Sequence, residues 1–515
     1  MSTSPTPQPR PSLRLWPVWI ILGLAAGVHL FAQLQSSWPF QRRNLVTLGT
    51  VVVDLVALLL WWMFGSRVPW KTRFQGLALL LLLALGIFSV FRLKGVSGDF
   101  VPIVEARWKG VFSPTAPGPV TNANSRMGNQ ATAQDFFQFL GPNRNGKLAS
   151  PTLSTQWSNQ PPRLVWKQPI GGGWSGFALV GDLGITQEQH GPEEWITAYD
   201  LATGQRLWAH TNTARYDTTI AGEGPRATPT VVSHRVYALG ATGILDCLDL
   251  RTGRLVWSRN IAQEAQRGVP EWGYAGSPWV DSKRVVVQAG GHDGKTLLAF
   301  HPESGAPLWN AGNQGYNYSS PYLASVSGRA QFLLFEGRNL VSHDPETGKV
   351  LWEYPFGTGM PLVANPILVS SNRILITAGY NVGAELLEMK FPSEPPVSLW
   401  KSKKLKAKFA NPVYHEGFVY GLDDGILACI DVRDGSQRWK EGRYGHGQGL
   451  WVQDLYLLLS ETGELVLLRP TPEGAHELAR QPVLDSKTWN PIALQGNRLV
   501  IRNDREAACL QLSLN

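Results

Sequence analysis

Cysteine is scarce in this sequence, with only Cys247, Cys429 and Cys509 among 515 residues. Each lies at the same place in a repeated apolar strand, two residues before an Asp or Gln. Equivalent positions in separate repeats are too far apart for the geometry of a disulfide. We therefore expect three buried, unpaired thiols.

Several motifs of enzymes are also missing. The sequence has no Walker A segment, no H-E-x-x-H and no C-x-x-C, and its histidines are scattered singly, without metal-ligand spacing. Residues 171–176 match G-x-G-x-x-G, but they lie between predicted strands and open no helix, so a dinucleotide fold is not expected. The repeated region shows no helical periodicity, which argues against a solenoid of helix pairs.

Acidic residues are rare at the N-terminal end, where residues 1–134 hold 12 Lys and Arg against three Asp and Glu. The remainder is close to neutral, so the net charge of +8 comes from the N-terminal end. This position suggests basic residues that flank membrane spans more than a surface that binds nucleic acid. Residues 16–34, 45–64 and 74–91 are apolar runs of about the length that a bilayer core demands. We predict a three-helix membrane anchor over 1–94, and no cleaved signal peptide, because two further full-length runs follow the first.

Three spans place the two ends of the anchor on opposite sides of the membrane. Five basic residues flank the spans on the side of the N-terminus and four on the opposite side. By the positive-inside rule, this small excess favours an N-terminus in the cytoplasm, which puts the C-terminal part of the chain outside the cytoplasm. The residues counted are Arg10, Arg14, Arg67, Lys71 and Arg73 against Arg42, Arg43, Arg92 and Lys94.

His29 and Asp54 are ionisable residues inside the predicted spans. Such groups are costly in a membrane, so they suggest a proton relay or a quinone site. The alternative is an interhelical hydrogen bond in a small bundle, which we favour.

Residues 95–134 are rich in Pro, Gly, Thr, Asn and Ser and are predicted to be a juxtamembrane segment and linker. Within it, residues 98–102 and 107–108 form a short patch suited to the membrane surface.

The C-terminal part repeats the pattern Asp-x-x-Thr-Gly-x-x-x-Trp. Full copies occupy 200–208, 249–257 and 344–352, and weaker copies lie at 301–309 and 431–439. Each copy reads as an apolar strand, a turn whose Gly adopts positive φ, and a second strand that ends in Trp. The Trp residues at 166, 208, 257, 309, 352, 400 and 439 are separated by 39 to 52 residues. This is the period of four-stranded propeller blades, and the repeated Asp, Gly and Trp are expected to be turn and packing residues.

The two ends of this region complete each other. Residues 164–166 match only the last strand of a unit, whereas 490–512 supply the first three strands and stop. With seven units between them, we predict an all-β, eight-bladed propeller over 135–515, whose last blade is closed by the strand at 163–170.

Small polar residues precede the predicted innermost strands and should ring one mouth of the propeller. They are Thr228, Ser277, Ser320, Asn365, Asn411 and Asn490, each followed by Pro, with Ser175 and Gln448 in the Pro-less copies. Aromatic and charged residues lie beside them: Trp174, Glu223, Arg226, Tyr274, Tyr316, Tyr318, Phe409, Tyr444, His446 and Trp489. Such a funnel suits a flat polar cofactor or small substrate. The alternative, which we favour, is that Ser, Thr and Asn cap strand starts.

The eight-unit count, the Asp-x-x-Thr-Gly-x-x-x-Trp signature and the Gly-Ile-Leu-x-Cys-Leu/Ile-Asp strands closely resemble the PQQ-like, or quinoprotein-type, β-propeller family. Residues 140–146, 224–230 and 98–100 look like membrane-anchored bacterial members of it, which are similar to the BamB assembly factor. This scaffold carries both enzymes and binding platforms. BamB-type proteins are lipid-anchored through a Cys, and here no Cys precedes Cys247, so the assembly-complex role does not transfer directly.

The resemblance implies two functions. We predict a non-catalytic scaffold that binds envelope proteins at the bacterial inner membrane, with the propeller facing the periplasm and no role for nucleic acid. The alternative is a PQQ-dependent dehydrogenase that oxidises an alcohol or sugar and passes electrons to the membrane. This chain departs from those enzymes in its near-minimal blades and its lack of adjacent cysteines. A weaker third option is a wall protein that binds polysaccharide.

If PQQ and Ca²⁺ are bound, the resemblance suggests residues for both. Asn365, Asn411 or Asn490 would supply an amide oxygen and Glu223 a carboxylate to the metal. Arg226 would pair with PQQ carboxylates, and Trp174 or Trp489 would stack on the ring.

Overall fold

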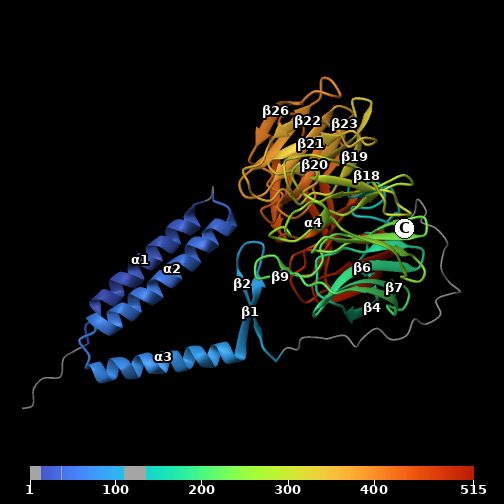
Figure 1. Cartoon of the computed structure of the whole chain (residues 1–515). Coiled ribbons are helices and arrows are strands. Elements are labelled where there is room, and N and C mark those ends of the chain that lie inside the picture. The colour runs from blue at the N-terminus through green and yellow to red at the C-terminus, as the bar shows by residue number, and fades with distance from the viewer. Residues whose placement is uncertain (1–12, 36–37, 109–134) are drawn as a thin grey trace, which may run out of the picture. The chain divides into compact units, whose positions relative to one another are not determined.

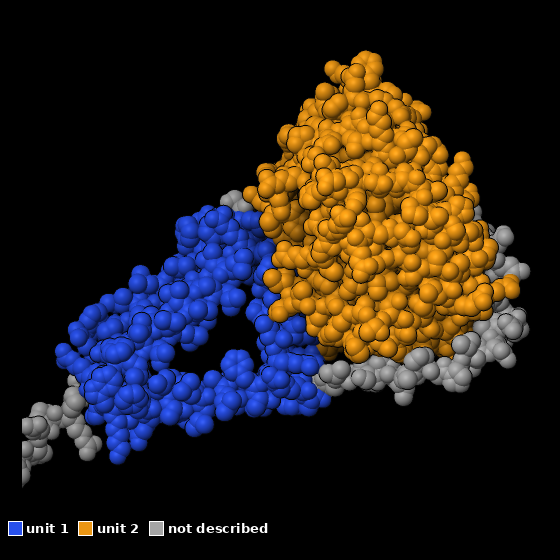
Figure 2. Space-filling view, viewed as in Figure 1, with its two compact units in different colours: residues 1–111 blue, residues 112–515 orange. Residues whose placement is uncertain are grey.

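The computed structural model describes residues 13–35, 38–108 and 135–515. The chain divides into two compact units, residues 1–111 and 112–515 (Figures 1 and 2). The first unit holds three apolar helices, and the second is an eight-bladed β-propeller. The fold class predicted from the sequence is confirmed.

Three helices form most of the first unit: α1 (Trp16–Leu34), α2 (Phe40–Leu60), which continues into the π-helical turn η1 (Trp61–Gly65), and α3 (Trp70–Val90). Each is long and apolar enough to cross a membrane. Pro39 and Pro69 directly precede α2 and α3, where a fixed φ and a missing N–H suit a helix start. His29 Nδ1 lies 3.1 Å from Thr47 Oγ1 of α2, which is an interhelical hydrogen bond of the kind expected for His29.

A β-hairpin follows α3 without a break. It pairs β1 (Phe91–Val96) with β2 (Pro102–Ala106) in antiparallel register. The predicted linker therefore begins within an ordered hairpin, and its later part, 109–134, lies outside the described residues.

Each blade of the propeller is a four-stranded antiparallel core sheet, and the strands of the first seven blades follow chain order. Blade 1 consists of β5 (Ala178–Val180), β6 (Leu183–His190), β7 (Glu193–Asp200) and β8 (Arg206–Asn212), and blade 2 of β11 (Thr230–Val232), β12 (Arg235–Leu239), β13 (Ile244–Asp249) and β14 (Leu255–Asn260). Blade 3 consists of β15 (Trp279–Val280), β16 (Val285–Gln288), β17 (Leu297–Phe300) and β18 (Pro307–Ala311), and blade 4 of β19 (Tyr322–Val326), β20 (Arg329–Glu336), β21 (Asn339–His343) and β22 (Val350–Pro355).

Blade 5 consists of β23 (Ile367–Ser370), β24 (Arg373–Ala378), β25 (Gly383–Glu388) and β26 (Val397–Ser402). Blade 6 consists of β27 (Val413–His415), β28 (Phe418–Asp423), β29 (Ile426–Asp431) and β30 (Gln437–Arg443). Blade 7 consists of β31 (Gln448–Val452), β32 (Leu455–Leu459), β33 (Glu464–Thr471) and β34 (Gly474–Pro482). Short elements lie between or before the blades: β3 (Lys147–Leu148), β9 (Asp217–Thr218), β10 (Gly222–Glu223) and the helix α4 (Ile261–Glu264).

Blade 8 joins the two ends of the propeller. Its strands are β35 (Ala493–Gln495), β36 (Arg498–Arg502) and β37 (Glu506–Gln511), and β4 (Arg163–Pro169) adds the outer strand. β4 pairs antiparallel with β37, so the last blade contains chain from both ends of the domain. Closing the ring in this way leaves no open sheet between the first and last blades.

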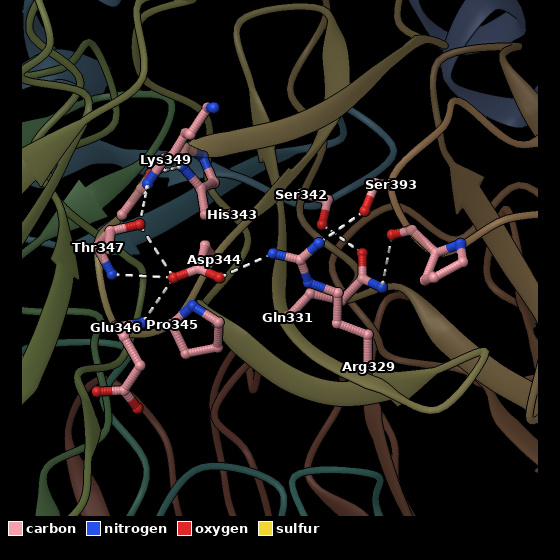
Figure 3. Close-up of polar contacts among 12 residues, drawn as sticks. Arg329, Gln331, Ser342, His343, Asp344, Pro345, Glu346, Thr347, Lys349 and Ser393 are labelled. Carbon is pink, nitrogen blue, oxygen red and sulfur yellow. Dashed lines mark hydrogen bonds and ion pairs between the residues drawn. The ribbon is translucent and has the colours of Figure 1, made fainter.

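The repeated Asp and Thr build the turn between the third and fourth strands of a blade. In blade 4, Asp344 Oδ1 accepts hydrogen bonds from the N–H groups of Glu346 and Thr347, at 3.1 and 3.0 Å, and from Thr347 Oγ1 (Figure 3). Asp344 Oδ2 also forms an ion pair with Arg329 Nη2 at 2.9 Å. The carboxylate thus satisfies the turn backbone, which is why this residue recurs in the motif.

The motif's Gly and Trp belong to neighbouring blades. Trp208, on the outer strand of blade 1, lies against Gly253 of blade 2, and its indole N–H donates to the Leu250 carbonyl at 3.1 Å. The same packing joins Trp166 to Gly204, Trp257 to Gly305, Trp309 to Gly348 and Trp400 to Gly435. The expected packing role of these residues is therefore confirmed.

A methyl group at Gly253 is expected to destabilise this blade contact. Its φ is +66°, and a Cβ would come within 2.5 Å of Trp208 Cε3. Gly253→Ala should lower the free energy of unfolding by roughly 2–4 kcal/mol, from overpacking and left-handed strain together. Urea unfolding followed by tryptophan fluorescence would measure the loss.

Gly328→Ala is the matched control, because Gly328 has a similar φ of +79° and, among the described residues, no atom lies within 4 Å of the place that an added methyl would occupy. It should cost only the backbone strain of about 1 kcal/mol. Equal losses in the two variants would show that the contact with Trp208 does not matter.

The three cysteines are buried and unpaired, as the sequence predicted. Burial raises the pKa of Cys247 and Cys429 to about 12 and that of Cys509 to about 11. Because the thiolate is the reactive form, these side chains are expected to be inert in the folded protein.

Candidate binding face of the propeller

The small polar residues before the innermost strands form hydrogen bonds from one blade to the next. The N–H of Thr228 donates to Ser277 Oγ at 2.9 Å, and the N–H of Ser277 donates to Ser320 Oγ at 2.9 Å. The series continues from Ser320 to Asn365 Oδ1 at 3.0 Å, and from Asn365 to Asn411 Oδ1 at 2.8 Å. Each side chain therefore satisfies the backbone of the preceding blade. The sequence predicted where these polar residues lie, but it did not predict which backbone N–H group each side chain accepts.

Asn490 makes the corresponding link from blade 8 to blade 1. Its Nδ2 donates to the carbonyls of Gly173 and Ser175, at 3.0 and 2.9 Å. Its Oδ1 is buried, and none of the described residues forms a hydrogen bond with it. Among the three asparagines expected to offer an amide oxygen to a metal, Asn490 alone has that oxygen unpaired.

Arg226 and Glu223 lie in the loop between blades 1 and 2, where both are engaged. Arg226 Nη2 donates to the carbonyls of Ala221 and Gly222, at 2.9 and 2.8 Å, and its Nη1 donates to that of Gly224. Glu223 Oε1 lies 2.8 Å from Arg215 Nη1, and burial raises the pKa of its carboxyl. These two side chains hold their own loop together.

Aromatic rings form a continuous series of contacts across the same face. The ring centroids of Trp174 and Trp489 are 4.9 Å apart, those of Trp489 and Phe409 are 4.9 Å apart, and Trp272 lies 6.3 Å from Phe409 and 5.4 Å from Tyr318. We call this set, together with Tyr380, Tyr316 and Tyr274, the aromatic face.

Trp272 is the centre of the aromatic face and was missed in the sequence, as was Tyr380. Trp272 contacts Tyr318, Tyr380 and Phe409, which come from three other segments of the chain. Both missed residues are half-buried and lie outside the positions directly before innermost strands. Tyr380 follows β24, in the turn between the second and third strands of blade 5, so a search of those turns would have found it. Tyr444, which was expected there, is buried and instead donates to Glu477 Oε2 at 3.0 Å.

Cationic side chains lie over several of these rings. Lys487 Nζ is 4.0 Å from the Trp489 centroid and 4.8 Å from that of Trp174. Lys408 Nζ is 5.0 Å from the Tyr380 centroid. Cation–aromatic contacts of this kind help to hold the rings in place.

These features match known propellers. A family model described as outer membrane protein assembly factor BamB matches residues 192–441. BamB of Burkholderia pseudomallei (strain K96243) is 24% identical over an alignment that covers 53% of this chain and 83% of that protein. The crystal structure of BamB from Moraxella catarrhalis covers 68% of this chain and 99% of its own, with a TM-score of 0.50 and 14% identity.

The chain carries a PQQ-like, BamB-like β-propeller. A europium-containing methanol dehydrogenase is also similar, with a TM-score of 0.55 and 11% identity, covering 73% of this chain and 98% of that one. Identities this low show a shared fold and leave the activity open.

The axis of the BamB-like propeller is crossed by its own N-terminal segment, residues 135–148, which we call the axial plug. Phe136 pairs with Leu179 of blade 1, the Phe137 carbonyl accepts from Val231 of blade 2, and β3 pairs in parallel with β31 of blade 7. Arg144 of the same segment bonds to residues directly before the innermost strand of blade 3, which is opposite blade 7, so the plug lies across the axis.

Arg144 lies at the tip of the plug and is almost fully buried. Its Nη1 donates to the carbonyls of Ser277 and Pro321, at 3.3 and 3.0 Å, and its Nη2 donates to Pro278 and to Thr230 Oγ1. One guanidinium thus bonds to blades 2, 3 and 4. Burial lowers the pKa of Arg144 to about 9, so it stays charged at neutral pH.

The residues suggested for PQQ and Ca²⁺ do not fit that pair of groups. Calcium takes six to eight oxygen ligands. Here the Asn365 and Asn411 oxygens already accept backbone N–H groups, and Glu223 is paired with Arg215. Over the described ranges, no three His, Cys, Asp or Glu side chains gather closely enough to hold a metal ion. We therefore assign no step of chemistry to this face.

A cavity of about 270 Å³ lies away from the aromatic face, beside the turn in Figure 3. It is lined by Trp279, Asp281, Arg284, Leu323, Arg329, Ala330, Asp344, Pro345 and Glu346. Its charged residues join blades 3 and 4, since Arg284 Nη2 meets Glu346 at 2.7 Å. The lining thus serves the contact between blades.

Proposed function

We propose that this protein is a membrane-tethered scaffold of the bacterial envelope, which binds other envelope proteins through the aromatic face and performs no catalysis. The observation that carries the proposal is that polar and aromatic side chains have different roles on that face. The polar side chains that a cofactor would need mostly bond to the propeller's own backbone. Five rings of the aromatic face remain partly exposed, those of Trp272, Tyr318, Tyr380, Phe409 and Trp489. Aromatic residues on a rigid frame are the usual anchors of protein interfaces.

The placement in the envelope rests on two supports. The three apolar helices would anchor the chain in the inner membrane, and the small excess of basic residues on the N-terminal side favours a periplasmic propeller. The similar proteins are described as outer membrane protein assembly factors, which act in the same envelope. A PQQ-dependent dehydrogenase remains the second candidate, because the methanol dehydrogenase shares the fold.

Photocrosslinking in cells tests the scaffold directly. A benzoylphenylalanine placed at Trp272 or Tyr380 is expected to give discrete adducts with envelope proteins after irradiation. The same residue at Leu255, which is 42% exposed on the outer strand β14, is the matched control and should give few. Adducts of equal pattern and yield at all three sites would argue against a specific face.

Calorimetry of the purified protein with PQQ plus Ca²⁺ tests the second candidate. We expect no heat of binding and no dye-linked oxidation of alcohols or sugars. Binding with turnover would overturn the non-catalytic assignment.

A further inference from the structure

The hairpin of β1 and β2 exposes apolar side chains on one face and covers a carboxylate on the other, which is the reverse of a hairpin in water. Leu93 and Val104 are cross-strand partners on one face and are 56% and 61% exposed. Arg92 and Glu105 pair across the other face at 3.1 Å, and Glu105 is only 8% exposed. A buried carboxylate on one face and exposed apolar side chains on the other indicate that something apolar covers the second face.

Aromatic rings extend the apolar face at the base of the hairpin. Phe91 shares the face of Leu93 and is 41% exposed, and Trp108 is 71% exposed with its ring centroid 6.4 Å from that of Phe91. Large aromatic side chains are enriched where a membrane meets water.

Both ends of the hairpin are bonded to helices. At its base, the Arg107 N–H donates to the Val90 carbonyl and its Nε donates to that of Phe88, both at 2.8 Å, so it is bonded to the last turn of α3. At its tip, the Asp99 carbonyl accepts from Asn44 Nδ2, near the start of α2, at 2.9 Å.

These two anchor points lie at the same membrane boundary. The end of α2 is joined to the start of α3 through η1 and residues 66–69, so the start of α2 and the end of α3 share one side of any membrane that both cross. A hairpin bonded to both therefore runs along this boundary instead of projecting from it.

We propose that the β1–β2 hairpin lies in the lipid headgroup and acyl boundary of the membrane, with Phe91, Leu93, Val104 and Trp108 inserted into it. Lipid is the occupant that the structure favours, because β1 begins at the residue after α3 ends and the apolar surface of the helix continues onto the hairpin. Amphipathic elements of this kind lie in the plane of the interface. The inference rests on α3 crossing the membrane, as in the proposed function.

Spin labelling of the full chain in phosphatidylcholine and phosphatidylglycerol vesicles tests this placement. A label at Val104→Cys should collide with oxygen more often than with a water-soluble nickel chelate. Leu93→Cys, on the facing strand, should give the same result. The buried native cysteines should leave the unsubstituted chain nearly unlabelled, which provides the background.

Two control positions separate the possible failures. A label at Leu82→Cys, 66% exposed in α3, should report the bilayer interior, and one at Leu255→Cys on the propeller should report water. An aqueous signal at Leu82 would overturn the membrane anchor itself. A bilayer signal at Leu82 with an aqueous signal at Val104 would overturn the hairpin proposal alone. So would a label at Val104 that is immobile and shielded from both colliders, because protein would then cover the face.

Discussion

Arg144→Met is expected to lower the free energy of unfolding of the propeller by about 3–5 kcal/mol, because it leaves several buried acceptors without their donor. The guanidinium donates to backbone carbonyls of blades 3 and 4 and to a hydroxyl of blade 2, and water cannot readily replace it at a side chain that is 3% exposed. Methionine fills similar space but leaves those carbonyls unsatisfied, and each such buried group costs about 1–3 kcal/mol. Urea unfolding of the full chain in detergent, followed by tryptophan fluorescence, would measure the change.

Arg469→Met is the matched control for this substitution. The Arg469 side chain is 44% exposed and pairs with Asp454 at 2.9 Å on the surface. Such a pair contributes about 0–1 kcal/mol, so the variant should unfold almost as the wild type does. Hydrogen exchange should also quicken in β11, β15 and β19 of the Arg144 variant. Losses of the same size in both variants would contradict the role of the plug.

Glu336→Gln is expected to cost about 3–5 kcal/mol at pH 6, because it breaks a fully buried ion pair. Glu336 Oε1 lies 2.7 Å from His343 Nε2, and both side chains are fully buried. His343 Nδ1 lies 2.8 Å from the Gly348 carbonyl, so both ring nitrogens face acceptors, an arrangement that favours the charged imidazole. Glu388→Gln is the control, because that carboxylate pairs with Arg373 nearer the surface, at 25% exposure.

The same pair predicts how stability depends on pH. Burial acts to lower the pKa of His343, but the adjacent Glu336 carboxylate and the Gly348 carbonyl outweigh it and raise the pKa above 6.5. A raised folded pKa stabilises the fold fully below the unfolded value, and the gain disappears as pH rises through the folded value. Unfolding free energies measured from pH 6 to 9 should therefore include a decline above pH 6.5 from this residue. In Glu336→Gln that decline should vanish or change sign, and an unchanged slope would refute the assignment.

The sequence was sufficient for the fold because the repeat is local. Asp344, Thr347 and Gly348 specify one turn through bonds that span a few residues, and the same turn recurs in blade after blade. Blade 5 shows the limit of this logic. Its β25–β26 connection lacks the motif, and Trp352 of blade 4 instead donates to Gln331 of its own blade at 2.9 Å. Regular spacing of Trp predicted the blades without revealing this change of partner.

The candidate site was harder to predict because its contacts are distant in the sequence. Asn365 and Asn411 were placed before innermost strands, but only the structure shows that their oxygens accept N–H groups some 45 residues away. Arg144 has no local signature at all, since the carbonyls that it binds lie more than 130 residues along the chain. Trp272 was missed because its importance comes from three rings supplied by other segments.

The axial plug also determines how the propeller would respond to mechanical force. The described chain of this domain begins at residue 135, so a pull from its N-terminal side loads the plug before it reaches β4, the strand that closes the ring. The load would meet the pairing of β3 with β31 and the bonds of Arg144 to three blades. A plug that takes the load first would keep the seam of blade 8 closed while the chain before residue 135 is under tension.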